Sequence, residues 1–133
     1  QLQIEMVARP DSLAGGPGKA WLTGYERSNV GEMLAAAGIP VVADPRPAQN
    51  FFRRSDNYRF AIAGIPSHAL SSFGMHSDLH NAGDGAEKAD FVHMAIVVGE
   101  AAKAVRLLAS GPRPEWKPGG RPTPPPPATP PAP

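Results

Sequence analysis

Two histidines and three acidic or amide side chains lie within the thirteen residues from Ser72 to Asp84, SFGMHSDLHNAGD. Gly74 and Gly83 bracket this cluster and favour a loop over a helix. The run IPSHAL before it is typical of a buried strand, and an amphipathic helix is predicted after it. Loops between apolar elements often carry the chemistry of α/β proteins. The candidate functional residues are therefore His76, Asp78, His80 and Asp84.

Imidazole and carboxylate groups are the nitrogen and oxygen ligands that zinc prefers in proteins. The residues alone therefore favour a hydrolytic metal site, although the spacing of His76 and His80 matches no general metal motif. Glu5 stands near the end of a predicted strand. That position fits a ligand-binding carboxylate at a sheet edge and a solvent-facing edge residue equally well.

The remaining histidines and other kinds of site fit less well. His68, inside an apolar strand, is interpreted as a hydrogen-bonded structural residue, and His93 as structural or solvated. The chain has no cysteine, which excludes disulfides, thiolate metal sites and a cysteine nucleophile. The sequence also contains neither a GxSxG nucleophile motif nor a phosphate-binding P-loop.

The overall composition limits the possible partners. With 133 residues and a formal net charge of +1, the chain offers no electrostatic case for nucleic-acid or anionic-membrane binding. It has no apolar run near the roughly 20 residues that a transmembrane helix needs, and no recognisable signal peptide.

Alternating strands and helices predict an α/β fold with a mostly parallel sheet. Strands are predicted at residues 2–8, 19–23, 39–43 and 65–71, and helices at 28–37, 55–63 and 90–110. Ser28, Ser55-Asp56 and Asp90 are the predicted N-caps. The last helix is expected to bury an apolar stripe of Phe91, Met94, Val98, Val105 and Leu108.

The two ends of the chain differ from its middle. Strand-like alternation begins at once, with Leu2, Ile4 and Met6, which predicts that functional residues lie upstream of Gln1. Residues 112–133 are predicted to be a disordered proline-rich tail, because they lack the apolar content to fold. Arg121 leaves open that this tail binds a partner, but a spacer fits the composition better.

Four segments come in an order and spacing that resemble one protein family. They are IEMVARPD at 4–11, GYERSN at 24–29, FFRRSDNYRFAIAGIP at 51–66 and FGMHSDLHNAGDGAEKADFVHM at 73–94. Together, residues 1–110 resemble the C-terminal half of the di-zinc aminopeptidases, a family that includes glutaminyl cyclases and transferrin-receptor-like proteins. The resemblance implies that residues 1–111 are part of a three-layer α/β/α sandwich of the phosphorylase/hydrolase type.

The resemblance also implies roles for individual residues. The family holds two zinc ions, and its matching motif positions fall on Glu5 and His80 in this chain. The other ligands and the general-base glutamate belong to the N-terminal half. Asp84 and Asp56 match supporting positions, which leaves His76 and Asp78 as bystanders.

One departure from the family bears on catalysis. Leu79 stands where many members have an aromatic residue, often a tyrosine that donates a hydrogen bond to the tetrahedral intermediate. An oxyanion contact of this kind is worth about 2.7–4 kcal/mol. Either another group supplies the contact here, or turnover is weaker.

The resemblance implies a zinc-dependent aminopeptidase acting on peptides with a free N-terminus, and it favours a secreted or periplasmic protein. The chain alone is expected to be inactive, because it supplies only two of the ligands. The alternative is a receptor or interaction module that kept the fold and lost the chemistry, as in transferrin-receptor-like proteins.

Overall fold

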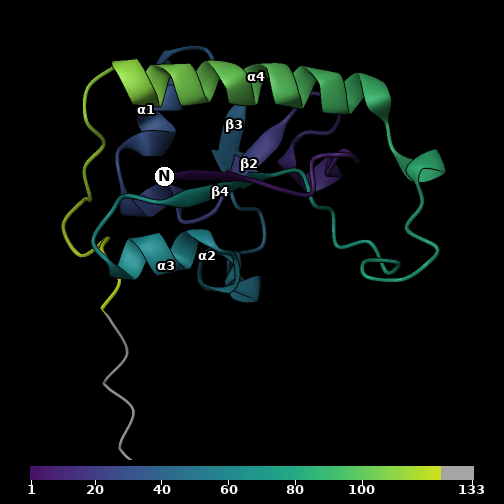
Figure 1. Cartoon of the computed structure of the whole chain (residues 1–133), viewed down its shortest axis with the longest axis horizontal. Helices are drawn as coiled ribbons and strands as arrows, with labels where there is room; N and C mark the ends of the chain where they lie inside the picture. Colours follow the sequence, from purple (N-terminus) through teal and green to yellow (C-terminus); the bar gives the residue numbers. More distant parts are fainter. Residues whose placement is uncertain (124–133) are drawn as a thin grey trace, which may run out of the picture.

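The computed structural model describes residues 1–123, and they form one open four-stranded sheet flanked by helices (Figure 1). The strands are β1 (Leu2–Ile4), β2 (Ala20–Leu22), β3 (Val41–Ala43) and β4 (His68–Ser71), in the order β1-β4-β2-β3. β1 pairs with β4 in parallel, and so does β2 with β3. The sheet is therefore mostly parallel, and the predicted α/β class is confirmed.

The central β2–β4 pair is antiparallel, which the sequence did not predict. The connection from β1 to β2 contains only the 3₁₀ segment η1 (Ser12–Ala14) and no crossover α-helix. Parallel strands need a crossover that carries the chain back along the sheet. Without one, β2 begins at the edge where β1 ends and runs in the opposite direction.

The helices pack on both faces of the sheet. They are α1 (Val30–Ala36), α2 (Phe51–Arg54), α3 (Asn57–Ile62) and α4 (Phe91–Ser110). On one face, α1 and α4 pack around Leu22 and Leu70 in the main core. A smaller aromatic cluster around Trp21 includes Phe51 of α2. Figure 1 shows α4 running lengthwise alongside β1 and β4 on one side of the sheet, with α2 and α3 on the other side.

The long helix α4 begins as predicted but buries a different side. The Asp90 carboxylate accepts a hydrogen bond from the His93 amide at 2.9 Å, an N-cap contact, and the helix ends before Gly111. The buried residues are His93, Val97, Ala101 and Ala104. The predicted stripe is wrong at Phe91, Val98 and Val105, which are 66%, 47% and 46% exposed. Leu108 packs against the core as predicted. The small alanines let α4 lie close to the sheet, which rotates the larger side chains outward.

Two N-cap predictions also need adjustment. The α1 N-cap is Asn29 instead of Ser28, although the Ser28 hydroxyl still accepts from the Val30 amide at 3.2 Å. Asp56 is the N-cap residue of α3 but makes no side-chain capping bond. Among residues 1–123, no helix combines the length and apolar character needed to span a bilayer.

Residues 113–121, which we call the strap, pack against the domain although they fall within the predicted disordered tail. Trp116 forms a β-bridge with Ser28, and its indole N–H donates to the Gly64 carbonyl at 3.0 Å. The Asn29 side chain accepts from the Glu115 amide at 2.9 Å. Trp116 supplies the apolar anchor that the prolines around it lack. Residues 124–133 of the predicted tail lie outside the described residues.

Trp116→Ala is expected to lower the free energy of unfolding by about 2 kcal/mol, roughly half the cost for a fully buried tryptophan. The variant loses the contact with His68, whose ring centroid lies 6.0 Å away, and the hydrogen bond to Gly64. Urea denaturation followed by circular dichroism measures the change. Glu115→Ala is the matched control, since Glu115 is exposed in the same segment. Equal stability of the two variants would show that the strap does not hold the fold.

Candidate functional site

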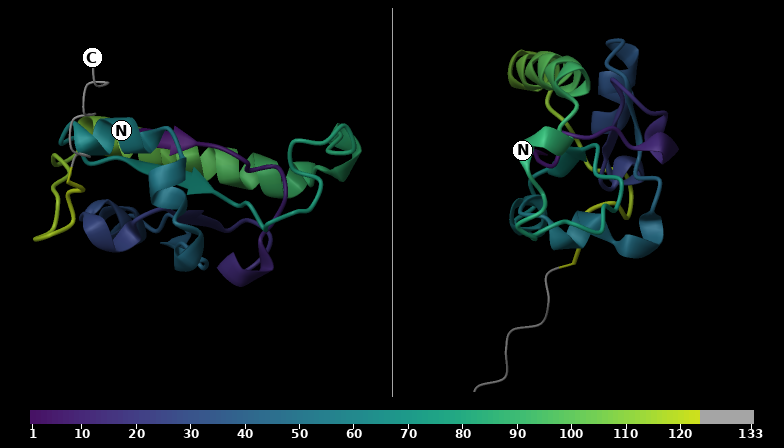
Figure 2. Two further views of the ribbon diagram at one scale, coloured as in Figure 1. Left: turned by 90° about the horizontal axis from the view of Figure 1, so that it is seen from below. Right: turned by 90° about the vertical axis from the view of Figure 1, so that its right-hand side faces the viewer.

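The predicted ligands Glu5 and His80 belong to segments that leave the sheet at the same edge. Because β1 and β4 run in parallel, their carboxyl ends lie side by side. Glu5 follows β1 directly, and its amide donates to the Leu70 carbonyl at 3.1 Å. The loop of residues 73–89 follows β4 and projects beyond the sheet (Figures 1 and 2). We call this region the β1/β4 edge.

Three of the four non-glycine residues with a left-handed backbone conformation in residues 1–123 lie at the β1/β4 edge, and the fourth is Asn50. Met6, Met75 and His80 have φ values of 50°, 62° and 63°. Non-glycine residues rarely adopt such angles, and those that do are often held there at functional sites. One of these residues follows Glu5 directly, and another is the predicted ligand His80 itself. The strain therefore falls on the two segments that carry the candidate ligands.

Arg9 links the segment of residues 5–9, which we call the β1 extension, to the loop. Its guanidinium lies 3.0 Å from Asp78 and also pairs with Asp84, while Lys88 Nζ lies 2.5 Å from Asp78. The hydrogen bonds from Lys88 and Arg9 hold the pKa of Asp78 well below its usual value. Asp78, interpreted from the sequence as a bystander, is therefore an ionised anchor of the loop.

A small cavity of about 80 Å³ lies between the β1 extension and the loop. Its lining comprises Met6, Ala8, Arg9, Phe73, His76, Leu79 and Asp84. His76 packs edge-on against Phe73, with ring centroids 5.1 Å apart. Burial and the nearby charge of Arg9 lower the pKa of His76. At neutral pH His76 is therefore a neutral packing residue of the loop.

Glu5 and His80 do not line that cavity. Glu5 is half-buried and His80 is exposed. Within residues 1–123, no three histidine, cysteine, aspartate or glutamate side chains come together as a possible metal site. The carboxylate and imidazole match zinc's ligand preference, but two ligands are too few to hold the ion alone. Zinc therefore fits the type of donor at this edge and would need further ligands from outside the described residues.

The predicted supporting residues take positions that the sequence did not specify. Asp84 pairs with Arg9, and residues 1–123 contain no hydrogen bond between Asp84 and His80. Asp84 therefore contacts the β1 extension. Asp56 is exposed, and its side chain makes no hydrogen bond or ion pair with other residues of the described range. The structure thus brings Asp84 to the β1/β4 edge and gives Asp56 no contact there.

A second ion pair, missed in the sequence, lies close to the start of the loop. Asp11 is 1% exposed and binds Arg46 through both carboxylate oxygens, at 2.5 and 2.9 Å. Its carboxylate also accepts from the Leu13 amide at 3.0 Å. Burial by itself would raise the pKa of Asp11, but Arg46 and the Leu13 amide together lower it. This pair fixes the connection between β1 and β2.

The buried histidine His68 forms a hydrogen-bonded pair with Ser28. His68 Nδ1 lies 2.7 Å from the Thr23 carbonyl oxygen, which can only accept, so Nδ1 carries the proton. Nε2 then accepts from the Ser28 hydroxyl at 2.6 Å. Burial lowers the pKa of His68 to about 4. Both side chains are fully buried beneath the strap, so the pair is structural and not an accessible nucleophile.

His93 adopts the opposite tautomer. Its Nδ1 accepts from the Gly18 amide at 2.8 Å, so Nε2 carries the proton and donates to the Ser72 hydroxyl at 2.9 Å. Ser72 in turn donates to the Arg9 carbonyl at 2.8 Å. This chain of bonds joins α4 to the start of the loop and to the β1 extension. The interpretation of His68 as a hydrogen-bonded structural residue is confirmed. Of the two readings of His93, the structural one is confirmed and the solvated one is wrong, since the side chain is fully buried.

Searches against protein-family models, curated proteins and solved structures find no match to this chain.

Stability is expected to fall as the pH drops from about 6.5 to about 4, because His68 has a depressed pKa when folded. The unfolded chain, with a histidine pKa near 6.5, binds more protons in this interval than the folded chain. The full stabilisation is present above pH 6.5, and its loss approaches about 3 kcal/mol below pH 4. Urea titrations at pH 7.5, 5.5 and 4.5 measure it. His68→Gln should make this dependence shallower and leave the contributions of His76 and His93, whose folded pKa values are also lowered. The same change at exposed His80 should preserve the full dependence. An unchanged pH profile in His68→Gln contradicts the assignment.

Replacing Arg9 with glutamine should loosen the loop without unfolding the sheet, because it removes the shared partner of Asp78 and Asp84. Amide hydrogen exchange in residues 76–88 should become severalfold faster, while the amides of β4 keep their protection. Arg106→Gln, on the exposed side of α4, is the matched control. Unaltered exchange in the loop would mean that Arg9 does not anchor it.

Proposed function

We propose that this chain is the C-terminal part of a zinc-dependent, aminopeptidase-like hydrolase, in which Glu5 and His80 each supply one metal ligand. The observation that carries the proposal is the meeting of two segments at the β1/β4 edge. The carboxylate of one and the imidazole of the other stand beside a left-handed backbone, at Met6 and at His80. The substrate class that follows from the resemblance is a peptide with a free N-terminus.

The chain's own residues would orient the ligands. Glu5 extends the β1–β4 ladder through its amide, so its carboxylate leaves the strand at a fixed register. The exposed imidazole of His80 sits in a loop held by Arg9, Asp78 and Asp84. When bound, zinc would supply activation of a water molecule and polarisation of the peptide carbonyl.

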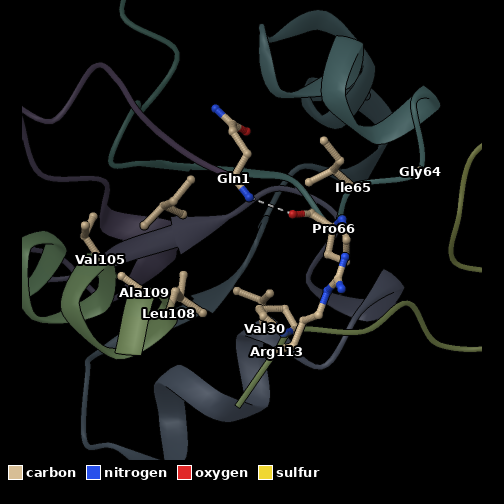
Figure 3. Close-up of a pocket in the computed structure, with 11 residues that line it drawn as sticks. Gln1, Val30, Gly64, Ile65, Pro66, Val105, Leu108, Ala109 and Arg113 are labelled. Carbon is tan, nitrogen blue, oxygen red and sulfur yellow. Dashed lines mark hydrogen bonds between the residues drawn. The ribbon is translucent and has the colours of Figure 1, made fainter. Parts of the chain in front are cut away.

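In the described part of the chain, the edge strand β1 has an unpaired side, and this supports the proposal that further ligands come from another part of a longer protein. In residues 1–123, β1 pairs with β4 on one side only, and Ile4 is 41% exposed. A mainly apolar pocket of about 350 Å³ opens beside β1, with Leu2, Val105 and Leu108 in its wall (Figure 3). A further strand beside β1 would cover this surface and extend the sheet of the proposed three-layer α/β/α sandwich.

One observation favours the alternative, a non-catalytic interaction module with the peptidase fold. Leu79 stands next to His80 and packs against the cluster formed by Trp21, Phe51 and Phe73. Its side chain therefore serves packing and offers no hydrogen-bond donor to a reaction intermediate. Zinc content separates the two proposals, since a module that has lost the chemistry has no need to retain the metal.

In a longer protein that supplies the remaining ligands, His80→Ala is expected to reduce bound zinc and to lower kcat/KM at least about a hundredfold. Zinc is measured by atomic absorption, and activity with an aminoacyl-p-nitroanilide. His76→Ala is the matched control from the same loop and should keep both zinc and activity. Glu5→Gln should lose zinc, and Glu5→Asp should keep it. Full activity with two bound zinc ions in His80→Ala refutes the ligand assignment. A longer protein without zinc would favour the non-catalytic module.

The isolated 133-residue chain is expected neither to bind zinc tightly nor to hydrolyse the same substrate, because it supplies too few ligands. Equilibrium dialysis with zinc and the same activity assay provide the measurement. Robust aminopeptidase activity of the chain alone would contradict the proposed division of the site.

A further inference from the structure

Three arginines from separate segments meet in one pocket, away from the β1/β4 edge. Arg27 ends the 3₁₀ segment η2 (Tyr25–Arg27), Arg53 belongs to α2, and Arg121 ends the strap. The pocket has a volume of about 330 Å³, and Phe52 and Tyr58 also line it. We call it the arginine pocket. Since η2 follows the carboxyl end of β2, which runs antiparallel to β4, it belongs to the opposite edge of the sheet.

The positive charge of the arginine pocket is poorly neutralised. No aspartate or glutamate lines it, and neither Arg53 nor Arg121 forms an ion pair with another side chain of residues 1–123. Arg27 meets Glu26 at 3.4 Å, but that carboxylate is 73% exposed and well screened. Residues 124–133 contain no acidic residue. For a chain with a net charge of +1, this is a strong local concentration of charge.

Aromatic stacking and close packing hold the guanidinium groups in place. Arg27 lies over the Phe52 ring at 4.6 Å and donates to the Gly120 carbonyl at 3.1 Å. Arg53 lies over the Tyr58 ring at 5.3 Å. Arg121 rests on Gly64, where a Cβ atom would come within 2.8 Å of its Nη2. A stacked guanidinium keeps N–H donors at its edge, so these arginines are positioned but retain donors for a ligand.

We propose that the arginine pocket binds a phosphate group, either as the free ion or as a monoester. A phosphate monoester carries nearly two negative charges at neutral pH and three acceptor oxygens, which suit several guanidinium groups at once. A carboxylate brings a single charge and two oxygens. The volume leaves room for a group attached to the phosphate beside Tyr58. This proposal rests on residues outside the β1/β4 edge and is independent of the proposed hydrolase.

The test is calorimetric titration of the 133-residue chain with sodium phosphate, phenyl phosphate and sodium acetate at constant ionic strength. Both phosphates should bind more tightly than acetate. The double variant Arg53→Gln/Arg121→Gln should bind them at least about tenfold more weakly, the loss expected for removing charge-assisted contacts. Arg59→Gln, an exposed arginine of α3 outside the pocket lining, is the matched control and should bind normally. Tighter binding of phenyl phosphate identifies a monoester ligand, and equal affinity identifies the free ion.

A titration of the unaltered chain followed by NMR keeps the proposal testable if the double variant does not fold. Phosphate should shift the amide signals of Tyr58, Gly119 and Thr123, all of which line the pocket. The proposal is overturned if millimolar phosphate shifts no signal or shifts signals elsewhere. It is also overturned if acetate binds equally well, or if Arg59→Gln weakens binding as much as the double variant.

Discussion

The parallel pairing of β1 with β4 determines where the chemistry of this chain can lie. It aligns Leu2 with His68 and Ile4 with Leu70, residues far apart in the sequence. Because the two strands point the same way, the segments that follow them emerge together, and Glu5 shares an edge with the loop of residues 73–89. Ser72 strengthens this arrangement, since its hydroxyl accepts from His93 and donates to the Arg9 carbonyl. Without this pairing, neither the Arg9 ion pairs nor the small cavity could form.

Buried polar groups hold the connections between strands, and each depends on a specific protonation state. A buried polar group without a partner costs about 1–3 kcal/mol, so a fixed proton position matters. A carbonyl faces Nδ1 of His68, so His68 donates through Nδ1. A backbone amide faces Nδ1 of His93, so His93 accepts there and donates through Nε2. The lowered pKa of each keeps the ring neutral at pH 7. Asp11, in contrast, stays charged because Arg46 binds both of its oxygens.

Local patterns in the sequence predicted the elements well but not their partners. Four strand positions, the Asp90 cap and the end of α4 at Gly111 follow from periodicity and capping preferences. The side that α4 buries does not, because Ala101 and Ala104 were less hydrophobic than Val98 and Val105 yet allowed closer packing. The antiparallel direction of β2 was also not predicted, because it follows from the lack of a crossover helix between β1 and β2.

The same limit applies to the site. Glu5, His80 and Asp84 came from motif resemblance, whereas the role of Arg9 required knowing that the β1 extension and the loop share an edge. The available clue was a basic residue, Arg9, directly after a predicted strand, together with two aspartates in the loop after another strand. Trp116 was a similar clue, since a lone tryptophan among prolines indicates an anchor. Proline content alone therefore did not predict that residues 113–121 pack against the domain.

The reversal of β2 places the two candidate sites at opposite ends of the strands. Carboxylates and cations pair at the β1/β4 edge, whereas no carboxylate of residues 1–123 lines the arginine pocket. Loops after β1 and β4 carry carboxylates and histidines to one edge, while the segment after β2 carries Arg27 to the other. The second edge also includes the strap, because Arg121 lies at its end and Trp116 covers the Ser28–His68 pair. A ligand that binds only the folded form stabilises it by mass action. An anion bound through Arg121 would therefore stabilise the packed strap and the buried His68 beneath it.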